Sequence, residues 1–301
     1  MPHSFNRENT SDSRFRRLEH LGRHPFKCAA WLWLSLLCLG TLSRAQQPDL
    51  EAQLERLAAA YRGEENSGNQ ARLLAFCQRN AKSPQAGLGF FLLGYRAFED
   101  RKFPEAQEYF EQSSRSATTL QDYVTFYLSS VAFERKELKE CQNQLMDFPS
   151  RFANSPLLAK ARLLFWQSSL QLKDGQAVLN SLKGMASLES NPEALFYQAQ
   201  AYELLGDASK ALPIFQRLHY QFPLYANAAA VAQSLSALGG TDAAVPKEWR
   251  TGRIEKLLSG RRHHDVLKDL PLLFALDPAA ANQPQYQLWQ GLSQFGTPQY
   301  Y

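Results

Sequence analysis

Apolar residues recur at helical spacing along most of this chain, and signals for β-strands are nearly absent. From residue 48 onward the sequence has no runs of β-branched residues and no Asn-Gly hairpin turn. The clearest segment, 194–223, predicts an amphipathic helix, a turn at Gly206-Asp207, a second helix and a stop at Pro223. The pattern therefore predicts an all-α fold built from pairs of helices.

The two-helix pattern repeats along the chain at a nearly constant interval. The small residue that lets the second helix approach its partner falls at positions separated by 35, 36 and 34 residues: Ala106, Cys141, Ala177 and Ala211. A weaker unit is expected at 50–84. One pair of helices cannot bury its apolar face alone, so such units stack on their neighbours. We therefore expect a solenoid over residues 46–240, with an irregular helical bundle as the alternative.

Several of these positions resemble the tetratricopeptide repeat, a helix-turn-helix unit of about 34 residues. In the segment 194–223 the resemblance is carried by Tyr202, Gly206, Ala211, Phe215 and Pro223. In an earlier unit it is carried by Leu93, Gly94, Phe103, Ala106 and Phe110. The resemblance implies a superhelix of stacked units whose concave face holds the partner.

The first 45 residues have the three-part pattern of a secretory signal. A long basic region precedes the charge-free stretch 28–43, and Ser43-Arg44-Ala45 places small residues at positions −3 and −1 of a signal-peptidase site. The charge-free stretch is short for a membrane span of about 20 residues. We expect residues 1–45 to be a signal peptide and the mature chain, from near Gln46, to be exported to the periplasm. An uncleaved inner-membrane anchor and a lipoprotein modified at Cys38 are the alternatives.

Charge and cysteine usage narrow the partners and the chemistry of the mature chain. Residues 1–45 hold seven of the basic and three of the acidic side chains, which leaves 26 of each in residues 46–301. This neutral body argues against nucleic acid as the partner, because phosphate binding needs a concentrated positive field. Cys77 and Cys141 lie about two repeats apart, too far for a disulfide. We expect both to be buried as small apolar residues.

A search for catalytic and metal-binding motifs is negative. The sequence contains no His-Glu-x-x-His zinc pattern, no Cys-x-x-Cys pair, no phosphate-binding loop and no Gly-x-Ser-x-Gly elbow. The run Arg261-Arg262-His263-His264-Asp265 is a candidate anion or metal site, although we interpret it as a solvated turn between helices. His219 is expected to be partly buried with a structural role. We therefore expect no catalytic residue, no metal and no cofactor.

Aromatic residues mark the predicted inner face of the first helix in each unit. Aromatic planes stack well on sugar rings and on apolar peptide side chains. Polar side chains at Arg162, Glu193 and Glu203 would give this face a rim. The alternative is that the rings fill the core between repeats. The candidate ligand-binding residues are Phe91, Tyr95, Phe98, Phe126, Phe133, Trp166 and Phe196.

Two later stretches extend the resemblance to a particular family. Residues 214–240 are similar to a helix-turn-helix junction of soluble lytic transglycosylases, and residues 250–274 resemble the next helical pair of that family. The likeness covers about residues 85–300. These are envelope enzymes that cleave the glycan strands of peptidoglycan. The resemblance implies a non-catalytic N-terminal superhelix that helps to hold the substrate, while a separate goose-lysozyme-like domain carries the catalytic glutamate.

That catalytic domain is not expected in this chain. In that family the catalytic glutamate belongs to a Glu-Ser motif that is soon followed by Gly-Leu-Met-Gln. Glu189-Ser190 and residues 291–294 superficially match these two motifs, but they lie 102 residues apart and Ser293 stands where the family has Met. A carboxylate in a turn between repeats also lacks the closed cleft that raises its pKa for acid catalysis. Residues 241–301 are expected to form a linker and a further helical pair without a capping helix, as the front part of a longer protein.

The sequence therefore favours an exported, non-catalytic helical-repeat scaffold of the cell envelope. Its expected partner is the glycan strand of peptidoglycan. The alternative is a periplasmic tetratricopeptide adaptor that binds another envelope protein through the same aromatic face. In either case nucleic acid is not expected as a partner, and a membrane is involved only through an uncleaved signal segment.

Overall fold

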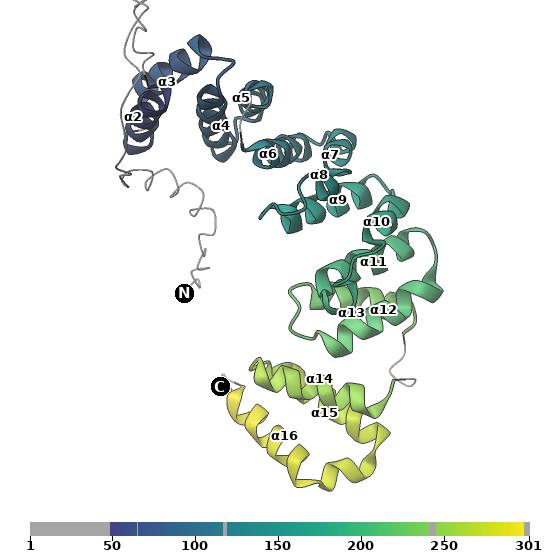
Figure 1. The fold of residues 1–301 in the computed structure, drawn as a ribbon. Coiled ribbons are helices and arrows are strands. Elements are labelled where there is room, and N and C mark those ends of the chain that lie inside the picture. Colours follow the sequence, from purple (N-terminus) through teal and green to yellow (C-terminus); the bar gives the residue numbers. More distant parts are fainter. Residues whose placement is uncertain (1–48, 65, 117–118, 241–244, 298–301) are drawn as a thin grey trace, which may run out of the picture. The chain divides into compact units, whose positions relative to one another are not determined.

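The computed structural model describes residues 49–297 except for 65, 117–118 and 241–244. The described residues belong to one compact unit, and they are arranged as helices that pack in sequential antiparallel pairs (Figure 1). This confirms the predicted all-α class and is consistent with a helix-turn-helix superhelix. The predicted signal peptide, residues 1–45, lies outside the described residues. Within the described ranges, no helix combines the length and the hydropathy needed to cross a bilayer.

The helices account for most of the described residues. Their bounds are α2 (Leu50–Gly63), α3 (Ser67–Arg79), α4 (Pro84–Glu99), α5 (Phe103–Arg115), α6 (Gln121–Glu134), α7 (Leu138–Leu145), α8 (Phe148–Arg151), α9 (Leu158–Gln171), α10 (Gly175–Leu182), the 3-10 helix η2 (Leu188–Ser190), α11 (Pro192–Leu204), α12 (Ala208–Gln221), α13 (Ala228–Ala237), α14 (Lys247–Ser259), α15 (His263–Leu276), the 3-10 helix η4 (Pro278–Asn282) and α16 (Pro284–Gly296). Each helix packs mainly on its neighbours along the chain. The first pair, α2 and α3, occupies the expected weaker unit at 50–84.

The same left-handed turn ends the first helix of successive pairs. The N–H of the residue after the turn donates to the carbonyl five residues earlier, as from Lys102 to Ala97 and from Glu137 to Ala132, both at 2.8 Å. This is the Schellman arrangement, which satisfies carbonyls left free at a helix end. Each of these turns contains one residue with positive φ, and these residues are Arg101, Lys136, Lys173, Gly206, Gly239 and Arg261.

These turns set the true register of the repeat and correct one prediction. Counting five residues beyond the positive-φ residue reaches the buried contact of the second helix at Ala106, Cys141, Val178 and Ala211. The prediction of Ala177 is therefore wrong by one position, because Ala177 is only half-buried. The close approach in this pair is supplied by Gly175, where an added β-carbon would lie 2.8 Å from the carbonyl oxygen of Ala201. Because Gly175 already allows the neighbouring helix to approach closely, the larger side chain of Val178 fits at the repeat position.

Buried apolar residues gather in three clusters along the described chain, spanning residues 54–131, 132–235 and 254–286. The third cluster joins the second through α14 and α12, where basic side chains meet the end of α12. Arg253 donates to the carbonyl of His219 at 2.5 Å, and Lys256 donates to that of Gln221 at 2.8 Å. Cations are favourable at a helix C-terminus, where carbonyls are free and the dipole is negative.

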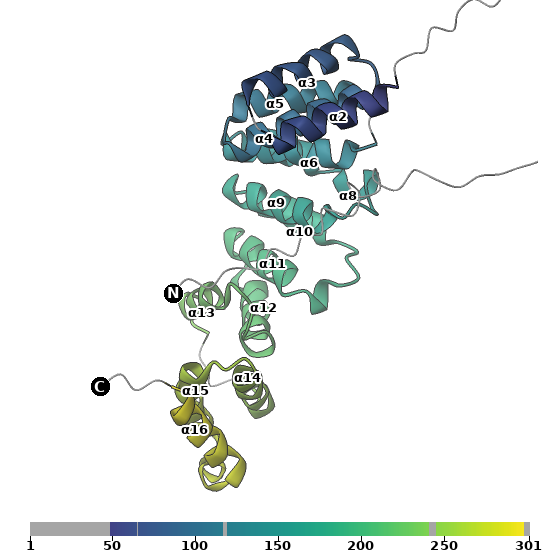
Figure 2. The ribbon, with the colours of Figure 1, turned by 90° about the vertical axis from the view of Figure 1, so that its left-hand side faces the viewer.

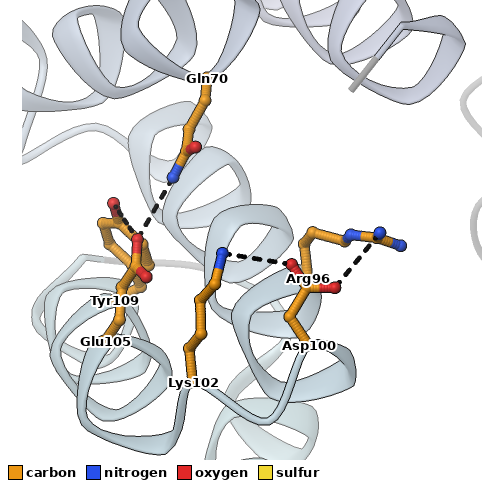
Figure 3. A network of polar contacts seen from close by, with 6 residues as sticks. All are labelled: Gln70, Arg96, Asp100, Lys102, Glu105 and Tyr109. Atoms are coloured by element: carbon orange, nitrogen blue, oxygen red, sulfur yellow. Dashed lines mark hydrogen bonds and ion pairs between the residues drawn. The ribbon is translucent and has the colours of Figure 1, made fainter. Parts of the chain in front are cut away.

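Polar contacts also tie neighbouring units together. Figure 3 shows Gln70 of α3 donating to Glu105 of α5 at 3.2 Å, and Tyr109 donating to the same carboxylate at 3.2 Å. Figure 2 shows α3 and α5 beside one another, as this contact requires. Near the turn between α4 and α5, Asp100 accepts from both Arg96 and Lys102. These contacts are partly exposed, so we expect them to align the helices and to add little to the stability of the fold.

Both described cysteines are buried and form no disulfide, as predicted. Burial raises the pKa of the Cys77 thiol to about 12 and that of the Cys141 thiol to about 11. Gly89 lies directly over Cys77, since an added β-carbon there would be 2.4 Å from the sulfur. Both cysteines therefore act as small packing groups.

Candidate binding surfaces

Aromatic rings from α4 and α6 meet in a single cluster, which we call the tyrosine patch: Tyr95, Phe98, Phe126 and Tyr127, with Phe91 beneath them. Tyr127 lies at its centre, with its ring centroid 5.3 Å from that of Tyr95, 5.5 Å from Phe98 and 5.4 Å from Phe126. The contacts are edge-to-face, the geometry that aromatic quadrupoles prefer. The structure thus brings together four of the seven predicted residues.

The tyrosine patch keeps part of its surface accessible. The Tyr95 side chain is exposed at 37 %, whereas Phe98, Phe126 and Tyr127 are half-buried and Phe91 is buried. Burial, followed by the neighbouring Tyr95 and Glu99, raises the pKa of the Tyr127 phenol well above its usual range. The Tyr127 hydroxyl therefore stays protonated at neutral pH and can donate a hydrogen bond.

Sequence reasoning missed two tyrosines of α6: Tyr127, at the centre of the patch, and Tyr123, which lies against Phe91. Tyr123 and Tyr127 repeat the four-residue spacing of Phe91 and Tyr95 after an interval of 32 residues. Tyr123 packs edge-on against Phe91, with 6.1 Å between ring centroids. That repeated spacing was the available signal.

The other three predicted aromatics lie apart from the tyrosine patch. Phe133 sits under the ammonium group of Lys136, 5.6 Å from its ring centroid. Trp166 is 3 % exposed and donates from Nε1 to the hydroxyl of Ser181 at 2.8 Å. Phe196 is 6 % exposed and packs in the second core cluster. Trp166 and Phe196 are therefore core residues whose rings have little accessible surface for a ligand.

A hollow of about 550 Å³ opens beside Trp166, where the first turns of α9 and α11 approach the segment between α10 and α11. Arg162 and Glu193, two of the three predicted rim residues, line it together with Lys160. The third, Glu203, lies elsewhere and accepts from the hydroxyl of Ser234 at 3.2 Å. A second hollow of about 520 Å³ lies between α10, α11 and the start of α12, and Met185 lines both.

The basic run 261–265 is only in part the predicted turn: Arg261 and Arg262 lie between α14 and α15, whereas residues 263–265 form the first turn of α15. Arg262 pairs with Asp265 at 2.6 Å, and a shallow hollow of about 290 Å³ adjoins the run. In the part of the chain that the structure describes, no three His, Cys, Asp or Glu side chains cluster closely enough to hold a metal ion. His219 is half-buried against Tyr220, in agreement with its predicted structural role.

Glu189 lies in the short helix η2 between two units. Its side chain is 69 % exposed and forms an ion pair with Arg217. Arg217 also donates to the backbone carbonyl of Glu189 at 2.8 Å. Glu189 thus lies in a short segment between two units, where the sequence placed it.

No known protein-family model and no curated protein matches this sequence.

Proposed function

We propose that this chain is an exported, non-catalytic helical-repeat scaffold that holds the glycan strands of peptidoglycan against the tyrosine patch. The observation that carries the proposal is a group of aromatic rings on a helical surface, of which Tyr95 is exposed and Phe98, Phe126 and Tyr127 are half-buried. The choice of glycan over other ligands comes from the resemblance of residues 85–300 to the superhelix of lytic transglycosylases. The periplasm is the location that this function requires.

The chemistry of the patch suits a sugar polymer. The apolar C–H face of a pyranose ring packs on aromatic planes, and its hydroxyl groups pair with neighbouring polar side chains. Tyr95 supplies both kinds of contact, and the neighbouring Arg96 forms an ion pair at 3.2 Å with Asp100, the residue that caps the end of α4. Contacts of this kind are individually weak, so retention of a long strand depends on many repeats of the sugar meeting the surface.

Cosedimentation with purified peptidoglycan sacculi tests the proposal. The chain is expected to pellet with sacculi, and Tyr95→Ala to reduce the pelleted fraction severalfold while leaving the circular dichroism spectrum unchanged. Phe295→Ala is the matched control, because Phe295 is 93 % exposed on α16, outside the patch. The proposal fails if the chain pellets no more than a neutral control protein, or if both variants behave like the parent.

A protein adaptor is the second candidate, and the surface of α16 favours it. Leu288, Leu292 and Phe295 are exposed at 60 %, 49 % and 93 % and are spaced four and three residues apart. Such spacing places them on one side of the helix, as in helices that dock against a partner protein. If an envelope protein is captured by the chain, and Phe295→Ala but not Tyr95→Ala abolishes capture, the adaptor is the better account.

A further inference from the structure

The hollow beside Trp166 combines an apolar wall with positive charge. Its apolar wall is formed by Leu158, Leu163, Trp166 and Met185, and its cations are Lys160 and Arg162. Its volume of about 550 Å³ falls within the range of sites that take small ligands, roughly 300–1,000 Å³. It is separate from the tyrosine patch on α4 and α6.

Arg162 lines this hollow and has no partner among the described residues. Its side chain is half-buried, and among the described residues no hydrogen bond or ion pair engages its guanidinium group. By contrast, the half-buried Arg217 pairs with Glu189, and Arg253 pairs with Asp269 at 2.6 Å. A planar guanidinium beside an apolar wall matches a carboxylate, which it can grip with two parallel hydrogen bonds.

The acidic side chain among the lining residues is already engaged. Tyr225 hydrogen-bonds Glu193, and Asn227 in turn donates to the Tyr225 hydroxyl at 2.9 Å. Glu193 keeps its negative charge, but the two cations Lys160 and Arg162 outnumber it among the residues that line the hollow. Charge complementarity therefore favours a ligand with a negative group at one end and apolar groups at the other.

We propose that this hollow binds the C-terminal carboxylate of a short peptide with small apolar side chains. The Arg162 guanidinium grips the carboxylate, Lys160 adds attraction at the mouth, and the wall of Leu163 and Met185 takes the methyl groups. Peptides ending in alanine, as peptidoglycan carries, have this chemistry. The assignment of that source rests on the proposed function, whereas the carboxylate site itself rests on the geometry of the hollow.

Calorimetric titration of the full chain with acetyl-D-Ala-D-Ala tests the site, with the C-terminal amide of the same dipeptide as the comparison. The free acid is expected to bind at least about tenfold more tightly than the amide, the difference that about 1.4 kcal/mol produces. Arg162→Gln should reduce the affinity for the acid to that for the amide. Arg72→Gln is the matched control, because Arg72 is exposed on α3 and away from the hollow.

Three results would overturn the site: no binding of the acid, equal affinity for acid and amide, or an unchanged affinity in Arg162→Gln. Arg162→Lys keeps the charge but loses the planar fork, so it should bind with intermediate affinity if the contact is as described. Peptide-free glycan strands separate the two proposals. If Tyr95-dependent retention of these strands persists while the dipeptide fails to bind, only the carboxylate site is wrong. If the dipeptide binds through Arg162 and the strands are not retained, the carboxylate site stands and the glycan scaffold is wrong.

Discussion

Replacing Lys136 with glycine should make the protein more stable than replacing it with alanine. Lys136 occupies a left-handed turn with φ of 66°, a conformation that is crowded for any residue with a β-carbon. The strain amounts to roughly 1–2 kcal/mol for a non-glycine residue. Glycine removes this strain, whereas alanine keeps it.

The size of the difference follows from what each variant loses. Both variants lose the contact of the Lys136 ammonium with the Phe133 ring, 5.6 Å from its centroid, so this contribution cancels between them. Glycine also gives the unfolded chain more freedom, which costs about 0.4–1 kcal/mol relative to alanine. The net advantage of Lys136→Gly over Lys136→Ala is therefore about 0.5–1 kcal/mol, which corresponds to roughly 1–4 °C in the midpoint of thermal unfolding.

Thermal unfolding followed by circular dichroism at 222 nm measures this difference in matched buffers. Gly206→Ala is the reciprocal change, because Gly206 has φ of 76° in the equivalent turn and an added β-carbon there would meet no atom within 4 Å. It should lower the midpoint by a similar amount. A Lys136→Gly midpoint at or below that of Lys136→Ala would refute the reasoning about the repeated turn.

Three further predictions concern packing, charge and reactivity. Gly94→Ala should destabilise the fold by about 1–3 kcal/mol, because the new β-carbon would lie 2.8 Å from aromatic ring carbons, whereas Gly252→Ala, with open space, should be neutral or stabilising in the same denaturation assay. Arg253→Met should destabilise the fold by up to about 3 kcal/mol at pH 7, because it leaves Asp269 half-buried and unpaired. Burial already raises the pKa of Asp269, so this loss of stability should shrink as the pH falls and the carboxyl becomes protonated. A loss of stability that is the same at pH 7 and pH 4 would contradict this. Ellman's reagent should not react with the two buried cysteines at pH 8 until the chain is unfolded, and rapid reaction of the native chain would show that they are accessible.

The helical pairs could be predicted because their signals are local. Helical spacing of apolar residues and turn residues such as Gly206 reflect interactions within a few residues of one another. The register failed at Ala177 because the close approach depends on which residue faces the neighbouring unit, and there Gly175 performs that role. Similarly, three of the left-handed turns within the repeats carry Arg101, Lys136 and Lys173, which a search for glycine passes over.

The candidate surfaces were harder to predict because burial is decided between units. Tyr95 and Trp166 are both aromatic residues on the first helix of a pair, and the sequence predicts the same inner face for both. In the structure, however, Tyr95 is exposed at 37 % and Trp166 at 3 %. The difference arises because Trp166 packs against Tyr197 of the next pair and donates to Ser181 of its own pair. The hollow around Arg162 likewise exists only when α9, α11 and the segment between α10 and α11 are placed together.

Hydrogen–deuterium exchange of the chain with and without peptide-free glycan strands tests the central claim most directly. If the tyrosine patch holds the strand, added glycan should slow amide exchange in α4 and α6, and this protection should disappear in Tyr95→Ala. Protection confined to α16, or no change in exchange at a glycan concentration that saturates cosedimentation, would contradict the account.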